Sequence, residues 1–248
     1  MRRPILALAA IVLIAVGLGL LLRGHAASQT RITVLAASSL TDAFPALAPG
    51  ETYSFGGSND LVAQIRQGAP ADVFASANTA FPAELHAQGL CSTPVVFTRN
   101  ELVVIVPKAN PAHVRGIRDL ASIGSGVRLV IAAEGVPVGD YTLAALDKLG
   151  IRPAVERNVV SRESDARGVL SKVALGEADA GFVYATDAKT AAKRLRVIEV
   201  PARAEPRVEY GICVVSHSNR EADARAFVRA VLSAAGQRTL ERYGFLPR

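Results

Sequence analysis

The chain has 248 residues, 50% of them hydrophobic, so it is long enough to form one or two domains with a sizeable core. Its net charge is +6, but Arg2, Arg3 and Arg23 supply three of these charges within an acid-free stretch of 27 residues, which leaves +3 on the rest. Aromatic residues make up only 5%, tryptophan is absent, and no run of lysine and arginine exceeds two residues, which argues against a nucleic-acid-binding surface.

The N-terminus has the pattern of an export signal. A basic start at residues 1–4 is followed by an uncharged apolar run from Ile5 to Leu22 and then by Arg23. This pattern predicts that residues 1–27 are either a cleaved signal peptide or a signal anchor that stays attached, and both alternatives remain open. No cysteine directly follows the run, so a lipoprotein signal is not expected. We expect the rest of the chain to be extracytoplasmic.

Strands and helices alternate along the chain. Strands are predicted at residues 30–37, 53–55, 72–76, 102–106, 128–132, 158–160, 181–184 and 208–215. Helices are predicted at residues 38–44, 60–67, 81–88, 137–148, 164–176, 187–193 and 221–243. Pro45 and Pro49 should stop the first helix, and the last should be interrupted near Gly236. This alternation predicts an α/β fold with parallel sheets. The segments after Leu61 and Leu170 share a weakly similar order of helix, glycine, aspartate and strand, which predicts two similar lobes.

Four predicted strand ends run directly into helix starts, at residues 38–39, 57–58, 137–139 and 165–166. Helix N-termini present unpaired N–H groups and the positive end of the helix dipole. In open α/β sheets, ligands bind outside the carboxyl ends of the strands. Several such ends facing one cleft would form an anion site without a lysine or arginine. The alternative is that Ser38, Ser39 and Ser58 are ordinary helix N-caps.

Seven segments follow one another in a recognisable order across residues 30–246. They are Ile32–Leu40, Gly68–Ser76, Asn100–Lys108, Asp165–Leu170, Gly181–Asp187, Val208–Val215 and Arg242–Phe245. Together they resemble the periplasmic molybdate-binding proteins of ABC transporters. The resemblance implies the two-lobed type II periplasmic binding protein fold, in which each lobe is a mixed, mostly parallel sheet flanked by helices and the ligand cleft lies between the lobes. We place lobe 1 at residues 30–106 plus 208–248 and lobe 2 at residues 107–207.

The resemblance also implies a ligand site. The family's oxyanion-binding positions fall on Ser39, Ser58, Val138, Ala166 and Tyr184. The serines and the tyrosine would act through their hydroxyls, Val138 and Ala166 through their backbone N–H groups, and the backbone of Ser38 is a further candidate. The implied ligand is molybdate or tungstate, which the sequence does not separate, with no cofactor and no side chain bound directly to the metal. The implied partners are a permease and its ATPase, with no nucleic acid, for a monomeric protein that is not an enzyme.

Other functions stay open as alternatives. A sulfate or phosphate binder is the nearest, because it would share the fold. A ferric-ion binder would need paired tyrosines, whereas the five tyrosines are isolated in the sequence. A serine hydrolase would need the G-x-S-x-G elbow, which the sequence around Ser39 lacks, and Gly124–Gly126 is a weak dinucleotide-binding pattern. A surface adhesion module would need no cleft.

The remaining reactive residues are better explained by structural roles than by ligand binding. Arg167 suits a structural salt bridge better than a grip on the anion, since a bidentate arginine would also hold phosphate and sulfate. The histidines are scattered and are not expected to be metal ligands; they are His25, His86, His113 and His217. Cys91 and Cys213 form no C-x-x-C motif. In an extracytoplasmic location they would either form a disulfide, which needs Cα atoms within about 7 Å, or remain two buried free thiols, and both alternatives stay open.

Overall fold

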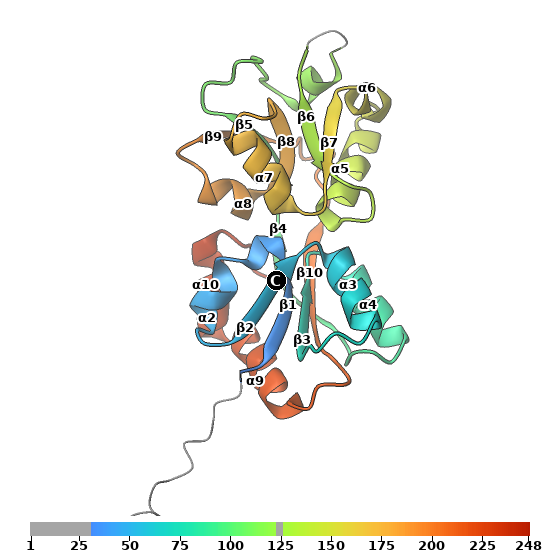
Figure 1. The fold of residues 1–248 in the computed structure, drawn as a ribbon. Coiled ribbons are helices and arrows are strands. Elements are labelled where there is room, and N and C mark those ends of the chain that lie inside the picture. Colours follow the sequence, from blue (N-terminus) through green and yellow to red (C-terminus); the bar gives the residue numbers. More distant parts are fainter. Residues whose placement is uncertain (1–30, 123–125) are drawn as a thin grey trace, which may run out of the picture. The chain divides into compact units, whose positions relative to one another are not determined.

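The computed structural model describes residues 31–122 and 126–248, and Ile32–Arg248 form one compact unit (Figure 1). The predicted export signal at residues 1–27 and most of the Gly124–Gly126 pattern lie outside the described residues. Within the described ranges, no helix is long and apolar enough to cross a membrane.

Two five-stranded sheets organise the described chain. The first has the order β2-β1-β3-β10-β4, made of Thr52–Gly56, Thr33–Ala37, Val73–Ser76, Val208–Val214 and Val95–Asn100. The second has the order β7-β6-β8-β5-β9, made of Val159–Glu163, Leu129–Ala132, Ala180–Tyr184, Leu102–Pro107 and Leu195–Glu199. The two sheets therefore share one strand order, as the similarity between the two segments of the sequence predicts.

Each sheet mixes parallel and antiparallel pairing. In the first, β1 runs parallel to β2 and β3, while β10 runs antiparallel to β3 and β4. In the second, β6 runs parallel to β7 and β8, while β5 runs antiparallel to β8 and β9. The prediction of mixed sheets is confirmed, but parallel pairs do not dominate. Strands β4 and β9, which were not predicted, supply half of the antiparallel pairs.

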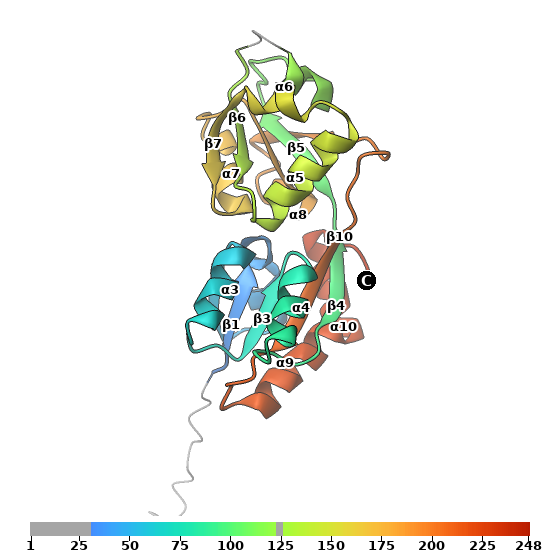
Figure 2. The same cartoon turned by 90° about the vertical axis from the view of Figure 1, so that its right-hand side faces the viewer.

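Helices flank both sheets (Figures 1 and 2). In the first half of the chain they are the short 3-10 helix η1 (Ser38–Leu40), α2 (Ala43–Leu47), α3 (Ser58–Arg66), α4 (Ala80–Ala87) and η2 (Ile117–Ala121). In the second half they are α5 (Pro137–Lys148), α6 (Arg152–Glu156), α7 (Ala166–Ala174), α8 (Ala185–Thr190), α9 (Glu221–Leu232) and α10 (Ala234–Tyr243). Helices α5 and α7 both pack on β6 and β8, so the loops that join these elements meet at one edge of the second sheet.

The predicted lobe boundary after Val106 is wrong. Strand β5, which contains Val106, pairs with β8 and β9 in the second sheet. The chain therefore leaves the first sheet between Asn100 and Leu102 and returns to it between Glu199 and Val208. We call residues 32–100 and 208–248 the first lobe and residues 101–207 the second lobe. A run of apolar residues predicts a buried strand, but it does not say which sheet the strand joins.

Two predicted helix ends also differ. Pro45 does not stop a helix but lies in the first turn of α2, where a proline is tolerated because the N–H groups there have no intrahelical partner. The C-terminal helices separate at Ser233 rather than at Gly236. Ser233 is the N-cap of α10, and its side chain accepts a hydrogen bond from the backbone N–H of Gly236. A larger residue does not fit at position 236, because an added Cβ would lie 2.2 Å from the carbonyl oxygen of Ala230.

The two cysteines lie close together in the core of the first lobe, but as free thiols. Of the two alternatives left open by the sequence, the structure has the two buried free thiols. Cys91 pairs with Val215 in an isolated antiparallel bridge, so Cys213 lies diagonally across from it rather than directly opposite. A hydrogen bond with Cys91, together with burial, raises the pKa of the Cys213 thiol. Cys213 is therefore a protonated core residue at neutral pH.

Candidate functional site

A pocket lies where the carboxyl ends of strands from both sheets meet. The residues lining it are Ala37, Ser38, Ser39, Gly56, Gly57, Ser58, Ala77, Val136, Pro137, Val138, Asp165, Ala166 and Tyr184. All five predicted ligand-binding residues and the additional candidate Ser38 are among them. The cavity volume is about 10 Å³, close to the roughly 10–15 Å³ that a single water molecule needs. The pocket therefore suits a small ion better than a sugar or a peptide.

The serines in the pocket are not helix N-caps. Ser38 and Ser39 lie inside η1, whose N-cap is Ala37, and Ser58 is the first residue of α3, whose N-cap is Gly57. The Ser39 hydroxyl is hydrogen-bonded to the Tyr210 hydroxyl at 2.8 Å. The Ser58 hydroxyl oxygen accepts a hydrogen bond from the backbone N–H of Ala77 at 3.1 Å, which leaves the Ser58 proton free to donate. The N-cap interpretation is therefore wrong for these three residues.

The backbone donors come from two helix N-termini in the second lobe. Ala166 is the first residue of α7, and Val138 is the second residue of α5, after Pro137. N–H groups at these positions have no intrahelical acceptor and lie at the positive end of the helix dipole. Both residues line the pocket and both are almost fully buried. They provide donors that water does not screen.

Tyr184 ends strand β8, and its hydroxyl lies at the pocket without a partner. The side chain is 1% exposed. Among the described residues its hydroxyl has no hydrogen-bond acceptor or donor. Burial raises the pKa of this phenol well above its usual value, so the proton stays on the oxygen. A buried hydroxyl without a partner costs free energy, and a ligand oxygen in the pocket would remove that cost.

The pocket wall carries donors but no basic side chain among the described residues that line it. Its one charged residue is Asp165, the N-cap of α7, whose carboxylate accepts a hydrogen bond from the backbone N–H of Gly168 at 2.9 Å. No histidine lines the described pocket either. Such a site can bind an anion through neutral dipoles, as helix N-termini commonly do.

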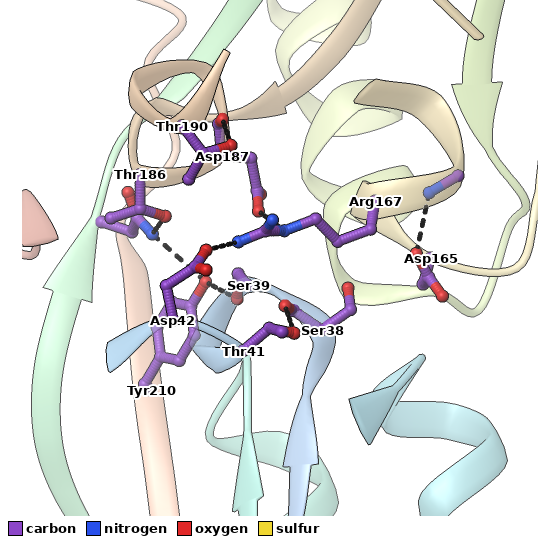
Figure 3. A network of polar contacts seen from close by, with 12 residues as sticks. Ser38, Ser39, Thr41, Asp42, Asp165, Arg167, Thr186, Asp187, Thr190 and Tyr210 are labelled. Atoms are coloured by element: carbon purple, nitrogen blue, oxygen red, sulfur yellow. Dashed lines mark hydrogen bonds and ion pairs between the residues drawn. The ribbon is translucent and has the colours of Figure 1, made fainter. Parts of the chain in front are cut away.

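Arg167 lies beside the pocket in a network of ion pairs (Figure 3). Its guanidinium pairs with Asp42, which follows η1 in the first lobe, and with Asp187 on α8 at 2.9 Å. Burial lowers the pKa of Arg167, but the two carboxylates more than offset this effect, so the residue stays charged. The salt-bridge interpretation of Arg167 is confirmed, and the pair with Asp42 joins the two lobes.

Asp187 is the buried end of that network. Its carboxylate is 0% exposed and one of its oxygens, Oδ2, has no hydrogen-bond partner within the described structure. Burial raises the pKa of Asp187 to about 6, although the charge of Arg167 acts in the opposite direction. The group is thus held as a carboxylate at neutral pH largely by Arg167.

A second buried network reaches the pocket through Ser39, and its other members were not predicted. Asn100, at the end of β4, donates from its amide nitrogen to the Tyr210 hydroxyl at 3.2 Å and to the Thr186 hydroxyl at 2.9 Å. All four side chains are buried. Alternation within β10 places Tyr210 on one face of the sheet, but the partner of its hydroxyl depends on how η1 packs, and no local pattern shows that.

Gly57 is where the lobes approach most closely at the pocket. A Cβ added there would lie 2.3 Å from the carbonyl oxygen of Ser164, in the loop before α7. That distance is shorter than real Cβ contacts, so only glycine permits this approach. The sequence marks Gly57 as the end of a strand, and the contact across the lobes explains its small size.

The structure corrects the sequence argument against an iron site. Tyr184 and Tyr210 are isolated in the sequence, yet their rings pack with centroids 5.7 Å apart. Burial raises the pKa of both phenols well above the usual value, whereas an iron ligand would have to be a phenolate. No group of three or more histidine, cysteine, aspartate or glutamate side chains that could hold a metal ion occurs within residues 31–122 and 126–248.

Known proteins resemble this chain in both sequence and structure. Residues 32–246 match the family of bacterial extracellular solute-binding proteins. The chain is 37% identical to the molybdate-binding protein ModA of Mycobacterium tuberculosis (strain ATCC 25618 / H37Rv), with 86% of this chain and 84% of that protein covered. It is 33% identical to ModA of Escherichia coli (strain K12), with 88% and 90% covered.

A solved structure shares the fold. The periplasmic molybdate-binding protein of Azotobacter vinelandii superimposes with a TM-score of 0.76 at 23% identity, covering 88% of this chain and 100% of that one. Its identity is low enough that it supports the fold alone. From the family match and the two sequence relatives, the chain belongs to the bacterial extracellular solute-binding proteins, in the group that contains the ModA relatives.

Proposed function

We propose that this protein binds molybdate or tungstate in the pocket between its two lobes and carries the dianion to the permease of an ABC transporter. The observation that carries the proposal is the pocket wall itself, where four hydroxyl side chains and the N-termini of α3, α5 and α7 meet without a basic residue among the described lining residues. Its relatives are named molybdate-binding proteins. The ligand would contact Ser39, Ser58, Val138, Ala166 and Tyr184, with the backbone of Ser38 nearby.

A wall of neutral donors selects an anion by its size and protonation. Sulfate is smaller than molybdate and would leave some buried donors unpaired, each at a desolvation cost. Phosphate carries a proton at neutral pH and needs an acceptor for it. The one carboxylate at the pocket, that of Asp165, accepts a hydrogen bond from the backbone N–H of Gly168 through Oδ1, so its second oxygen is the one that could accept this proton. We expect molybdate and tungstate to bind more tightly than either rival.

The protein would act by binding and would break no bond. A serine nucleophile needs a general base within hydrogen-bond reach. The Ser39 hydroxyl is bonded to Tyr210 instead, whose burial keeps it protonated, and no histidine is among the described lining residues. The protein would work as an extracytoplasmic monomer, and its lobes would close over the ligand before it docks on the permease and its ATPase.

Calorimetric titration with molybdate, tungstate, sulfate and phosphate tests the function. We expect one site for molybdate and tungstate, with sulfate and phosphate at least tenfold weaker. Molybdate at 100 times its Kd should add about 2.7 kcal/mol to the free energy of unfolding. Equal stabilisation by sulfate would contradict the selectivity. A folded protein that none of these anions stabilises would contradict the function itself.

Single substitutions test the residues. Ser39→Ala, Ser58→Ala and Tyr184→Phe each remove one charge-assisted hydrogen bond and should weaken molybdate binding roughly 10- to 150-fold. Tyr184→Phe should not destabilise the unliganded protein, because the lost hydroxyl has no partner there. The matched control is Tyr53→Phe, since the Tyr53 hydroxyl donates to the carbonyls of Phe44 and Ala48, away from the pocket. It should lower stability and leave binding unchanged.

A further inference from the structure

Four buried side chains form a chain of hydrogen bonds that runs from the pocket to the point where the backbone crosses between the lobes (Figure 3). In order they are Ser39, Tyr210, Asn100 and Thr186. Ser39 lines the pocket, whereas the other three do not. All four are at most 4% exposed, so water does not compete for these hydrogen bonds.

The amide orientation of Asn100 is determined by its neighbour. The backbone N–H of Glu101 donates to the Oδ1 atom of Asn100 at 2.9 Å, and an N–H group can only donate. The Nδ2 atom of Asn100 must therefore face Tyr210 and Thr186, and it has one proton for each of them. A flipped amide would place its nitrogen against the Glu101 N–H group, two donors in contact.

By geometry alone, either hydroxyl could donate in the bond between Ser39 and Tyr210. Because Asn100 is a donor, Ser39 is the one partner of the Tyr210 hydroxyl in the described structure that can accept its proton. Asn100 donates to the Tyr210 oxygen, so the Tyr210 proton is free for its other neighbour, the Ser39 oxygen at 2.8 Å. Ser39 then accepts from Tyr210, and the Ser39 proton has no acceptor within this chain of hydrogen bonds. The direction left for that proton is the pocket.

We propose that Tyr210 and Asn100 are positioning residues that hold the Ser39 hydroxyl as a donor toward the bound oxyanion. The inference rests on the proposed function, and it extends that function to residues outside the pocket wall. Without Tyr210 the Ser39 hydroxyl can rotate, and the ligand has to order it. With Tyr210 the donor is already aligned before the anion arrives, which lowers the cost of binding.

The chain of hydrogen bonds also spans the two lobes. Asn100 ends β4 in the first lobe, while Thr186 belongs to α8 in the second. The bond from Asn100 to Thr186 fixes the second amide proton, so the Asn100 side chain cannot turn away from Tyr210 while the lobes stay in contact. Alignment of the Ser39 hydroxyl is thus tied to the arrangement of the lobes at their crossing point.

The test is a double-mutant cycle with molybdate titrations on the full chain. Tyr210→Phe keeps the ring, which packs against Phe97 and Phe245, and removes the hydroxyl. We expect it to raise the Kd roughly tenfold in the wild-type background. In the Ser39→Ala background it should change the Kd less than twofold, because its effect passes through Ser39. An unchanged Kd in the wild type, or an equal loss in both backgrounds, would overturn the proposal.

A second variant keeps the proposal testable if Tyr210→Phe fails to fold. Asn100→Asp is nearly isosteric, but carboxylate oxygens only accept, so Tyr210 would donate to residue 100 and Ser39 would donate to Tyr210. We expect weaker binding at pH 7, and this loss should shrink in the Ser39→Ala background, whereas simple charge repulsion would persist there. Tyr53→Phe is the control for the loss of a partly buried phenol hydroxyl away from the pocket.

Failure of the inference and failure of the function have different signatures. If the wild type binds molybdate and the cycle shows no coupling between Tyr210 and Ser39, the positioning role is wrong and the proposed function stands. If the wild type binds sulfate instead, the cycle is run with sulfate and the same criteria apply. If the folded wild type binds none of the four oxyanions, both proposals are wrong.

Discussion

At the scale of single residues, the described lining of the pocket carries no positive side chain, and the nearby cation Arg167 is used beside it. Arg167 follows Ala166 in the sequence, so a cation lies next to a predicted ligand donor. Its guanidinium is nevertheless occupied by Asp42 and Asp187. An arginine in the pocket would bind any small anion strongly, while hydroxyls and N–H groups bind only an anion whose oxygens reach them. This division fits a protein that must separate oxyanions of equal charge.

The buried carboxylate of Asp187 predicts a pH dependence of stability. Its pKa is about 6 in the folded protein and 3.8 in the ordinary state, so between these values the folded chain binds more protons than the unfolded chain. The contribution of Asp187 to the free energy of unfolding should therefore fall as the pH rises from 4 to 6, by up to about 3 kcal/mol. The stability difference between wild type and Asp187→Asn, measured by urea unfolding, should shift by this amount and level off above pH 7.

Asp179 offers a control of opposite sign. Burial alone would raise the pKa of Asp179, but hydrogen bonds from Arg128 lower it on balance. The contribution of Asp179 is present above its ordinary pKa and lost as the pH falls. The difference between wild type and Asp179→Asn should therefore shrink on acidification. If the Asp187→Asn difference does not vary between pH 4 and 7, the raised pKa is wrong.

The sequence predicts the residues of the pocket wall better than the residues behind it. Ser39 and Tyr184 were found because each stands at a strand end within a recognisable segment, and Ser58 because it follows a predicted strand and stands three residues before Leu61. Tyr210 and Asn100 were missed because their role depends on the packing of η1 against β10 and on the crossing between the lobes. Such contacts join residues more than 100 positions apart, and no local periodicity encodes them.

At the scale of elements, local patterns predicted the strands that precede helices and missed the others. Each parallel strand is followed by a helix, and the change of hydrophobic period marks the boundary between them. Strands β4 and β9 lie at sheet edges in antiparallel pairs. Strand β9 contains exposed and charged residues, so it lacks the continuous apolar run that marked its neighbours. Strand β5 has such a run and was placed in the wrong lobe for a different reason, since an apolar run does not show which sheet a strand joins.

The close approach of Gly57, in the loop before α3, to Ser164 leads to a prediction about closure of the two lobes. The backbone of Gly57 has φ −62° and ψ 133°, which alanine adopts freely. A side chain there is opposed by the backbone carbonyl of Ser164 at 2.3 Å and by the Asn59 side chain at 2.7 Å, of which the carbonyl is the less able to move. Gly57→Ala should hold the lobes apart and weaken molybdate binding more than tenfold, with little loss of unliganded stability. Titration and urea unfolding measure the two effects. Gly116→Ala is the control, since an added Cβ there meets nothing within 4 Å. Normal binding by Gly57→Ala would show that closure does not depend on this approach.

At the scale of the whole described unit, few polar contacts join the lobes, and they lie around the pocket and the crossing. Arg167 pairs with Asp42, Asn100 donates to Thr186, and Lys189 donates to the carbonyl of Arg242 at 2.7 Å. Two of these three contacts involve a residue that is close in sequence to a pocket residue: Asp42 is close to Ser39, and Thr186 is close to Tyr184. Ligand binding and lobe contact therefore draw on the same segments, which is what a closing binding protein requires.

The ion pair between Asp42 and Arg167 should affect release of the ligand more than its capture. The Asp42 side chain is 45% exposed, so the pair contributes only about 0.2–1 kcal/mol. It exists only when the lobes are in contact, so Asp42→Asn should leave the association rate unchanged and speed dissociation by up to roughly fivefold, with a weaker dependence on salt. A chase of radiolabelled molybdate measures the rate. Asp223→Asn is the matched control, because Asp223 pairs with Arg220 within the first lobe. A slower association with unchanged dissociation would mean that Asp42 acts on capture and that the pair does not hold the lobes closed.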